Sequence, residues 1–236
     1  PIPLHDYDEP RVAGRYFEHP GNIMGQVHIS SDYRKMLALD ATYGMRQAYG
    51  YGNHARWYSL SPRFQPNSKL TMRYRFENNY AANDMGFADY TEDEDTVFFG
   101  RRYIPTIENS ITADYIINNK TAVNFRLRHY WSQVDFDKFY ILLPQGGLQP
   151  TDTFDENLDF SYKAFKLKLG WSWNFAPGSM LTVVWKNAMY FSEEKVAESY
   201  FSNIEKLSNE NASNSFSVRL LYFIHYEDAK QFIQTI

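Results

Sequence analysis

Nine charged residues lie at alternating positions in segments whose other positions are largely apolar. They are Arg73, Arg75, Glu77, Glu108, Asp114, Arg126, Arg128, Lys166 and Lys168. Residues two apart share one face of a β-strand, so each set projects to one side of its strand. Side by side, such sets form a transverse ladder of charges facing the lumen of a barrel. A ladder of this kind either tunes a pore or neutralises a filled interior, and the sequence favours neither.

A second candidate is an acidic segment that we expect to be an extracellular loop. Its carboxylates, with Asp84 nearby, belong to Asp89, Glu92, Asp93, Glu94 and Asp95. Oxygen ligands at this density are the type that Ca²⁺ prefers. The spacing is not that of an EF-hand, however, and an acidic loop is usually just solvated. The same alternatives apply to the acidic segment 152–159.

The nucleophiles and histidines give no recognisable catalytic or metal-binding motif. Four of the six histidines are scattered over different predicted strands and loops: His28, His54, His129 and His225. No two of these four histidines have the sequence spacing that is typical of metal ligands. His129, Ser132 and Asp135 have the residue types of a hydrolase triad, but a triad is defined by geometry rather than by spacing. We therefore predict no catalytic residue, no metal ligand and no cofactor.

The segments that must position these residues have a period of two. In the clearest, Lys166–Phe175, large apolar residues alternate with small or polar ones, which indicates a strand with one apolar and one polar face. The same alternation recurs in eight more segments. The nine predicted strands are roughly Ile23–Ser31, Met36–Gln47, Arg56–Phe64, Leu70–Glu77, Ile107–Ile117, Val123–Arg128, Lys166–Phe175, Leu181–Lys186 and Phe216–His225.

The connections between these strands alternate strictly between short and long. Four tight turns, at 31–34, 65–68, 118–120 and 176–179, contain the Asn, Asp, Gly and Pro residues of short hairpins. The other connections, near 47–55, 78–105, 132–159 and 191–214, are long and polar. In an up-and-down sheet this arrangement places all short turns at one end. Outer-membrane barrels, with periplasmic turns and extracellular loops, have the same asymmetry.

These patterns predict an all-β, antiparallel, up-and-down transmembrane β-barrel with about 9–10 strands in this chain. A soluble β-sandwich also has alternating strands and is the alternative. Strands of about ten to thirteen residues, however, suit a bilayer better than a sandwich. Arginines and lysines on the polar face suit a water-filled lumen. Aromatic residues near the strand ends suit interfacial girdles.

Composition excludes several other classes of protein. The 236 residues contain 18% aromatic residues, and no run is long and apolar enough for a transmembrane helix. A net charge of −4 argues against a nucleic-acid partner. Without cysteine, the chain has no disulfides, thiolate metal sites or cysteine nucleophiles.

Counting strands back from a periplasmic C-terminus places residues 1–20 outside the cell. Bacterial barrels have even strand numbers and a periplasmic N-terminus, so either Arg11–Glu18 is a tenth strand or upstream strands are absent. We favour the second interpretation, in which this chain is the C-terminal part of a larger barrel. The predicted organisation is an extension at 1–20, barrel strands at 21–226 and a periplasmic tail at 227–236.

Three segments resemble a family of large outer-membrane proteins of Gram-negative bacteria. They are Ile29–Leu39, Gly100–Tyr103 and Phe175–Ser179 followed by Val183-Val184-Trp185. In that family a module similar to family 9 carbohydrate-binding modules precedes a C-terminal β-barrel region of unknown function. The resemblance covers about residues 20–226 and therefore implies location and architecture, but no reaction and no sugar-contacting residue.

The sequence thus predicts a non-enzymatic protein of the cell outer membrane with a role in a pore, in transport or in a surface assembly. Its expected partners are outer-membrane lipid and lipopolysaccharide, together with other outer-membrane proteins or glycans, and no nucleic acid. The first alternative is a surface receptor or scaffold whose long loops bind a partner protein or glycan. The second is a soluble β-rich binding domain. A barrel enzyme using His129 or Ser132 is a further class.

Overall fold

The computed structural model describes residues 4–193 and 212–224, and these residues form an all-β protein. No helix in them is long and apolar enough to cross a bilayer. The strands are β1 (Leu4–Asp6), β2 (Phe17–His19), β3 (Asn22–Ser30), β4 (Leu37–Ala48), β5 (His54–Phe64), β6 (Leu70–Tyr90), β7 (Val97–Asn118), β8 (Thr121–Leu142), β9 (Leu148–Thr151), β10 (Phe160–Ala176), β11 (Ser179–Glu193) and β12 (Ser213–Leu221).

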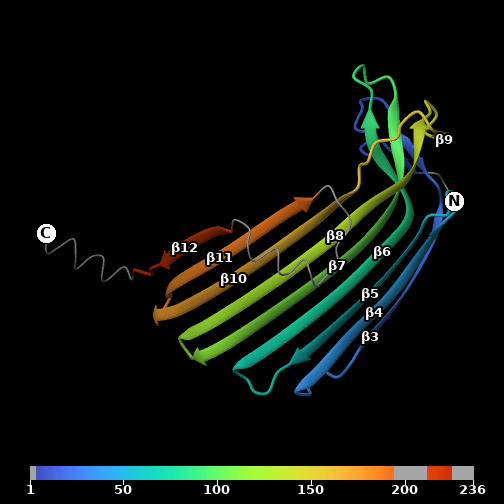
Figure 1. The fold of residues 1–236 in the computed structure, drawn as a ribbon. Helices are drawn as coiled ribbons and strands as arrows, with labels where there is room; N and C mark the ends of the chain where they lie inside the picture. The colour runs from blue at the N-terminus through green and yellow to red at the C-terminus, as the bar shows by residue number, and fades with distance from the viewer. Residues whose placement is uncertain (1–3, 194–211, 225–236) are drawn as a thin grey trace, which may run out of the picture.

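The main sheet is antiparallel and follows an up-and-down order. In the described residues its path is β3-β4-β5-β6-β7-β8-β10-β11-β12, with β9 paired to the outer part of β8. These nine strands are the nine that the sequence predicts, so the all-β, up-and-down prediction is confirmed. Figure 1 shows them as one strongly curved sheet. Within residues 4–193 and 212–224 the sheet does not close, and β3 and β12 form its two edges.

The four predicted short turns are also confirmed, and all lie at the same end of the sheet. Three of them are stabilised by a short polar side chain that accepts a hydrogen bond from the backbone N–H group two residues further along the chain. Asp32 accepts from Arg34, Asn67 from Lys69 and Asn118 from Lys120, at 2.8–3.0 Å. In the fourth turn Gly178 has φ +71°, a left-handed conformation that favours glycine.

The predicted long loops at 78–105 and 132–159 are wrong in extent, because strands occupy much of both. β6, β7 and β8 are 21 or 22 residues long, well beyond the predicted ten to thirteen. Bulges explain the discrepancy: the β6–β7 register shifts between Ala81 and Asp84 and again between Phe87 and Asp89. A bulge breaks the period of two although pairing continues beyond it. Most of the predicted connection 191–214 and the predicted tail lie outside the described residues.

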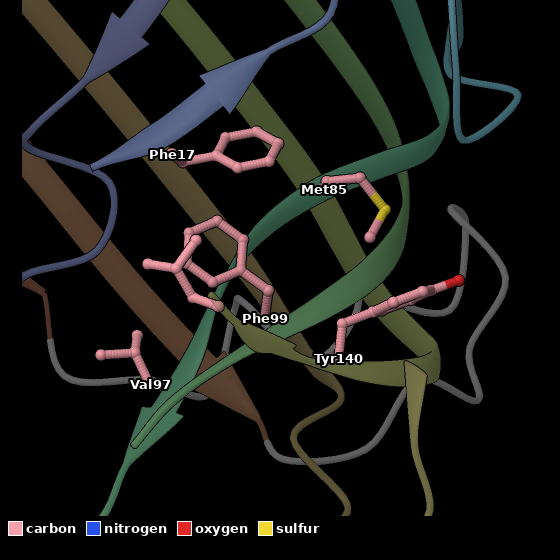
Figure 2. Packing of buried hydrophobic residues seen from close by; sticks show 6 residues of the cluster. Phe17, Met85, Val97, Phe99 and Tyr140 are labelled. Carbon is pink, nitrogen blue, oxygen red and sulfur yellow. The ribbon is translucent and has the colours of Figure 1, made fainter. Parts of the chain in front are cut away.

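The extended ends of β6, β7 and β8 carry the main hydrophobic cluster of the protein. It consists of Phe17, Met85, Val97, Phe99, Tyr140 and Leu142. Figure 2 shows the ring of Phe17, on β2, facing that of Phe99, on β7; their centroids are 5.0 Å apart. The N-terminal segment thus covers the extended strand ends. β2 pairs with β1 rather than with the main sheet, so Arg11–Glu18 is not a tenth strand of that sheet.

Polar contacts reinforce this docking of the N-terminal segment. A carboxylate oxygen of Glu9 accepts a hydrogen bond of 2.9 Å from the backbone N–H of Phe87. The guanidinium of Arg102 lies 2.6 Å from Asp84 and 3.4 Å from Glu9, so one cation joins β6, β7 and the N-terminal segment. We call this part of the molecule the outer cap. It consists of the N-terminal segment, β9, the extended ends of β6, β7 and β8, and the connections between these strand ends.

Candidate functional site

The register of the sheet separates the side chains into an apolar face and a polar face. Directly paired residues of antiparallel strands share a face, as do residues two apart in one strand. On the apolar face Trp185 pairs with Leu169, which pairs with Phe125. On the polar face Lys186 pairs with Lys168, which pairs with Arg126. The two chemically different faces predicted from Lys166–Phe175 therefore extend across neighbouring strands.

The register places all nine predicted ladder residues on the polar face. Eight of them form three rows across the strands, separated by two residues along each strand. The rows are Arg73–Thr112–Arg126–Lys168, then Arg75–Ser110–Arg128–Lys166, then Glu77–Glu108–Tyr130, with Asp114 opposite Asn124 at the short-turn end.

Two ion pairs form within the ladder, and both join adjacent rows. Arg128 donates to both carboxylate oxygens of Glu108, at 2.7 and 2.5 Å, which is the strong bidentate geometry of an arginine and a carboxylate. Arg75 forms an ion pair with Glu77, two residues along β6. Glu77 and Glu108 are direct neighbours across the β6–β7 pair. Pairing each carboxylate with an arginine offsets the repulsion between them.

The carboxylates are unevenly distributed across the polar face. Asp40, on β4, accepts hydrogen bonds from Tyr33 and, at 2.6 Å, from Ser30. Its register neighbour Ser61 places it on the polar face, so the acids of this face come from β4, β6 and β7. Asp40 is not among the nine predicted ladder residues, although the alternation in β4 identifies its face.

Five cations of the polar face lie close together on β8, β10 and β11, where they line a groove of about 370 Å³. Other cations of this face, Arg63, Arg73 and Arg75, lie on β5 and β6. We define the basic groove by its five cationic side chains, Arg126, Arg128, Lys166, Lys168 and Lys186. Lys186 is not among the nine predicted ladder residues, although the alternation in its strand identifies its face. Only the register shows that it lies opposite Lys168. Among the described residues, Glu108 is the single carboxylate that forms an ion pair with this set.

The remaining surroundings of the basic groove are neutral. Tyr190 and Ala188 line one side, and the Lys166 ammonium lies 5.1 Å from the centre of the Tyr190 ring, a cation–π distance. On the neighbouring strand Ser215 pairs with Lys186. The groove therefore combines adjacent positive charges with a hydroxyl and an aromatic ring, a combination that binds anions rather than cations.

The candidate calcium loop has a different geometry from the one expected. Asp89 belongs to strand β6, whereas Glu92, Asp93, Glu94 and Asp95 lie in the turn 91–96. Asp93 accepts hydrogen bonds from the Thr91 hydroxyl, at 2.6 Å, and from the Asp95 N–H, at 3.3 Å, so it stabilises the turn itself. Nowhere in the described residues do three or more such side chains form a group able to hold a metal ion.

His129 and Ser132 do not approach each other as a triad requires. Their odd spacing in the regular strand β8 places them on opposite faces: His129 pairs with Phe165, whereas Ser132 pairs with Tyr162. The Ser132 hydroxyl instead lies 2.9 Å from that of Thr106. These positions account for Ser132 as a cross-strand contact of the polar face.

The second acidic segment contributes to a cavity in the outer cap. This cavity, of about 710 Å³, is lined by aromatic residues such as Phe139 and Phe154 and by carboxylates such as Asp155 and Asp159. Asp159 accepts a hydrogen bond of 2.7 Å from the Phe136 N–H. Close by, burial raises the pKa of the Asp135 carboxyl, and the charge of Asp159 raises it further.

Fold and faces together define a class: an up-and-down antiparallel sheet with one apolar face and one charged face. The chain belongs to the family described as "Domain of unknown function (DUF5916)", whose model matches residues 1–233. The comparison with curated proteins finds no match. Among solved structures, the chain is similar to the ferric citrate transporter FecA in its unliganded form, with 12% identity and a TM-score of 0.49. The similarity covers 90% of this chain and 36% of the FecA chain.

Proposed function

We propose that this chain is part of a non-enzymatic β-barrel of the bacterial outer membrane, with the apolar face towards lipid and the polar face towards a lumen. The proposal is consistent with membership of a family of unknown function. It includes outer-membrane lipid and lipopolysaccharide as the surroundings of the sheet, and the upstream carbohydrate-binding-like module that the sequence resemblance implies.

The observation that carries the proposal is the large exposed area of the apolar face. Aliphatic and aromatic side chains remain exposed on it from one edge strand to the other, including Val27 at 63%, Leu60 at 43% and Phe216 at 73%. Soluble monomers rarely expose contiguous apolar patches of more than a few hundred Å². Lipid covers such a face without any further protein layer, and the charged opposite face then meets water.

The strand edges support the same interpretation. β3 and β12 each have a second edge without a partner among the described residues. Unpaired backbone groups are too costly in hydrocarbon, so a sheet in a bilayer must close. We propose that both edges are paired in the assembled barrel. The polar face would then enclose the ladder and the basic groove, so that charged side chains line the lumen as they do in a pore constriction.

Heat-modifiable migration and conductance test this function. A barrel should require detergent for extraction from the outer-membrane fraction, migrate faster unheated than boiled in gels, and carry ions across planar bilayers. Ready solubility in buffer without detergent contradicts the membrane assignment. A protein that inserts as a heat-modifiable barrel but carries no current contradicts the pore and leaves the membrane assignment intact.

The second candidate function, a surface receptor or scaffold, is favoured by the outer cap. Its cavity combines aromatic rings with hydrogen-bonding carboxylates, as sites for glycans or partner segments do. Deleting the turn 152–157 should abolish co-purification of a bound partner while conductance persists. Loss of conductance with partner binding intact would favour the pore instead.

A further inference from the structure

The basic groove concentrates positive charge without a matching number of acids. Arg126, Lys168 and Lys186 stand directly opposite one another on three consecutive strands. Cβ atoms of directly paired residues lie about 4.5–5.5 Å apart, and like charges at that separation repel. All three side chains are exposed. None of them forms an ion pair with a described carboxylate.

Repulsion of this kind is relieved when an anion binds between the cations. The neighbouring row adds Lys166 and Arg128, of which Arg128 is already engaged with Glu108. Four cations therefore remain for a ligand. Arg126 offers a planar donor fork that matches phosphate or carboxylate, whereas the lysines act as mobile point charges. On the neighbouring strand β12, Ser215 occupies the position opposite Lys186 and adds a hydroxyl to this row.

The size of the groove narrows the class of ligand. A volume of about 370 Å³ falls at the lower end of the range for small-molecule sites, roughly 300–1,000 Å³. Several cations around so small a space favour a compact solute with at least two negative charges over a monovalent ion. The ring of Tyr190 gives one wall an apolar surface.

We propose that the basic groove is a binding site for a small solute carrying two or more oxyanion groups, phosphate or carboxylate. The proposal deepens the proposed function, on which it rests for access to the polar face through a lumen. The same chemistry is present in a free solute and in the phosphorylated headgroup of lipopolysaccharide, so the experiment must separate these two sources.

The test measures binding of inorganic pyrophosphate to the full-length protein in lipopolysaccharide-free detergent micelles by calorimetry at low ionic strength. Wild type is compared with the double variant Lys168→Gln/Lys186→Gln. A matched control, Lys69→Gln/Lys120→Gln, removes the same charge from two turns at the short-turn end of the sheet. A conservative variant, Lys168→Arg/Lys186→Arg, keeps the groove charge, and heat-modifiable migration verifies that each variant folds.

We expect the glutamine variant to lose about tenfold or more in affinity, because each charge-assisted hydrogen bond to an oxyanion is worth roughly that factor. The control and the arginine variant should bind as wild type does. A parallel experiment uses vesicles that contain diphosphorylated lipid A. If wild type binds these vesicles but not pyrophosphate, and the glutamine variant does not bind the vesicles, the site is supported and the lipid headgroup is identified as the source of the oxyanions.

Equal affinities of wild type and glutamine variant for both probes overturn the proposal, as does an equal loss in the turn control. The absence of binding to either probe also overturns it. Binding in micelles requires no current, so the two proposals fail separately. Binding that depends on the groove, without conductance, supports the anion site and contradicts the pore. Conductance without binding contradicts the anion site and supports the pore.

Discussion

Substituting arginine at neighbouring positions of β5 tests which face of the sheet meets lipid. Leu60 and Ser59 are adjacent near the middle of β5 but belong to opposite faces: Leu60 pairs with Phe76 on the apolar face, and Ser59 pairs with Glu77 on the polar face. The same substitution at the two positions therefore differs in face while depth and strand stay fixed.

The expected cost follows from the transfer of a cation into hydrocarbon. An arginine on the lipid face costs about 2–4 kcal/mol at the bilayer midplane and about 0–1 kcal/mol near the interfaces. Leu60→Arg should thus lower the folding equilibrium constant by roughly 30- to 900-fold. Ser59→Arg should cost little, because the new cation faces Glu77. Phe64→Arg, on the apolar face at the short-turn end, should have a small effect.

Reversible unfolding by denaturant in lipid vesicles, followed by heat-modifiable migration, measures these differences. The reasoning is refuted if Leu60→Arg and Ser59→Arg destabilise equally. It is also refuted if Phe64→Arg costs as much as Leu60→Arg, because a buried protein interface has no dependence on depth in the bilayer. The control Leu60→Phe should remain close to wild type.

Two further predictions concern the outer cap. Phe99→Ala removes a fully buried ring that packs against Phe17 and should destabilise the cap by about 3–5 kcal/mol, seen as faster proteolysis of the N-terminal segment while the strands near the short turns stay protected. At pH values above the raised pKa of Asp135, Asp135→Asn should make the cap more stable than in wild type, because it removes a buried charge beside Asp159. Hydrogen exchange should show this gain shrinking as the pH falls and disappearing below about 3.9, the usual pKa of an unfolded aspartate, because the carboxyl is then protonated in both the folded and the unfolded state. A gain that is independent of pH contradicts the electrostatic cause.

The sequence predicts the main sheet well because the patterns that define its strands and turns involve only residues close together in the chain. Alternation in Lys166–Phe175 and the polar side chains Asp32 and Asn67 in the turns depend only on near neighbours in the chain, and each is confirmed. The prediction fails where the alternation is interrupted. Asn83, with φ +52°, lies at a bulge beyond which β6 continues.

Contacts between distant segments were not predictable in the same way. The ion pair of Arg128 and Glu108 depends on the β7–β8 register, and the packing of Phe17 on Phe99 joins segments 82 residues apart. Likewise, alternation alone identifies the face of Lys186 but not its position opposite Lys168. The basic groove therefore appears only once the register is known.

The orientation of the two faces is tested most directly by the fluorescence of single tryptophans in bilayers. Trp185 lies on the apolar face beside Leu169, whereas Trp57 lies on the polar face and donates a hydrogen bond of 3.1 Å to Gln26. Each is retained alone by changing the other four tryptophans to phenylalanine. In vesicles of lipids brominated along their acyl chains, Trp185 should be strongly quenched, whereas Trp57 should be quenched only by acrylamide in the water. Quenching of Trp57 by the brominated lipid, or of neither tryptophan, would contradict the membrane orientation proposed here.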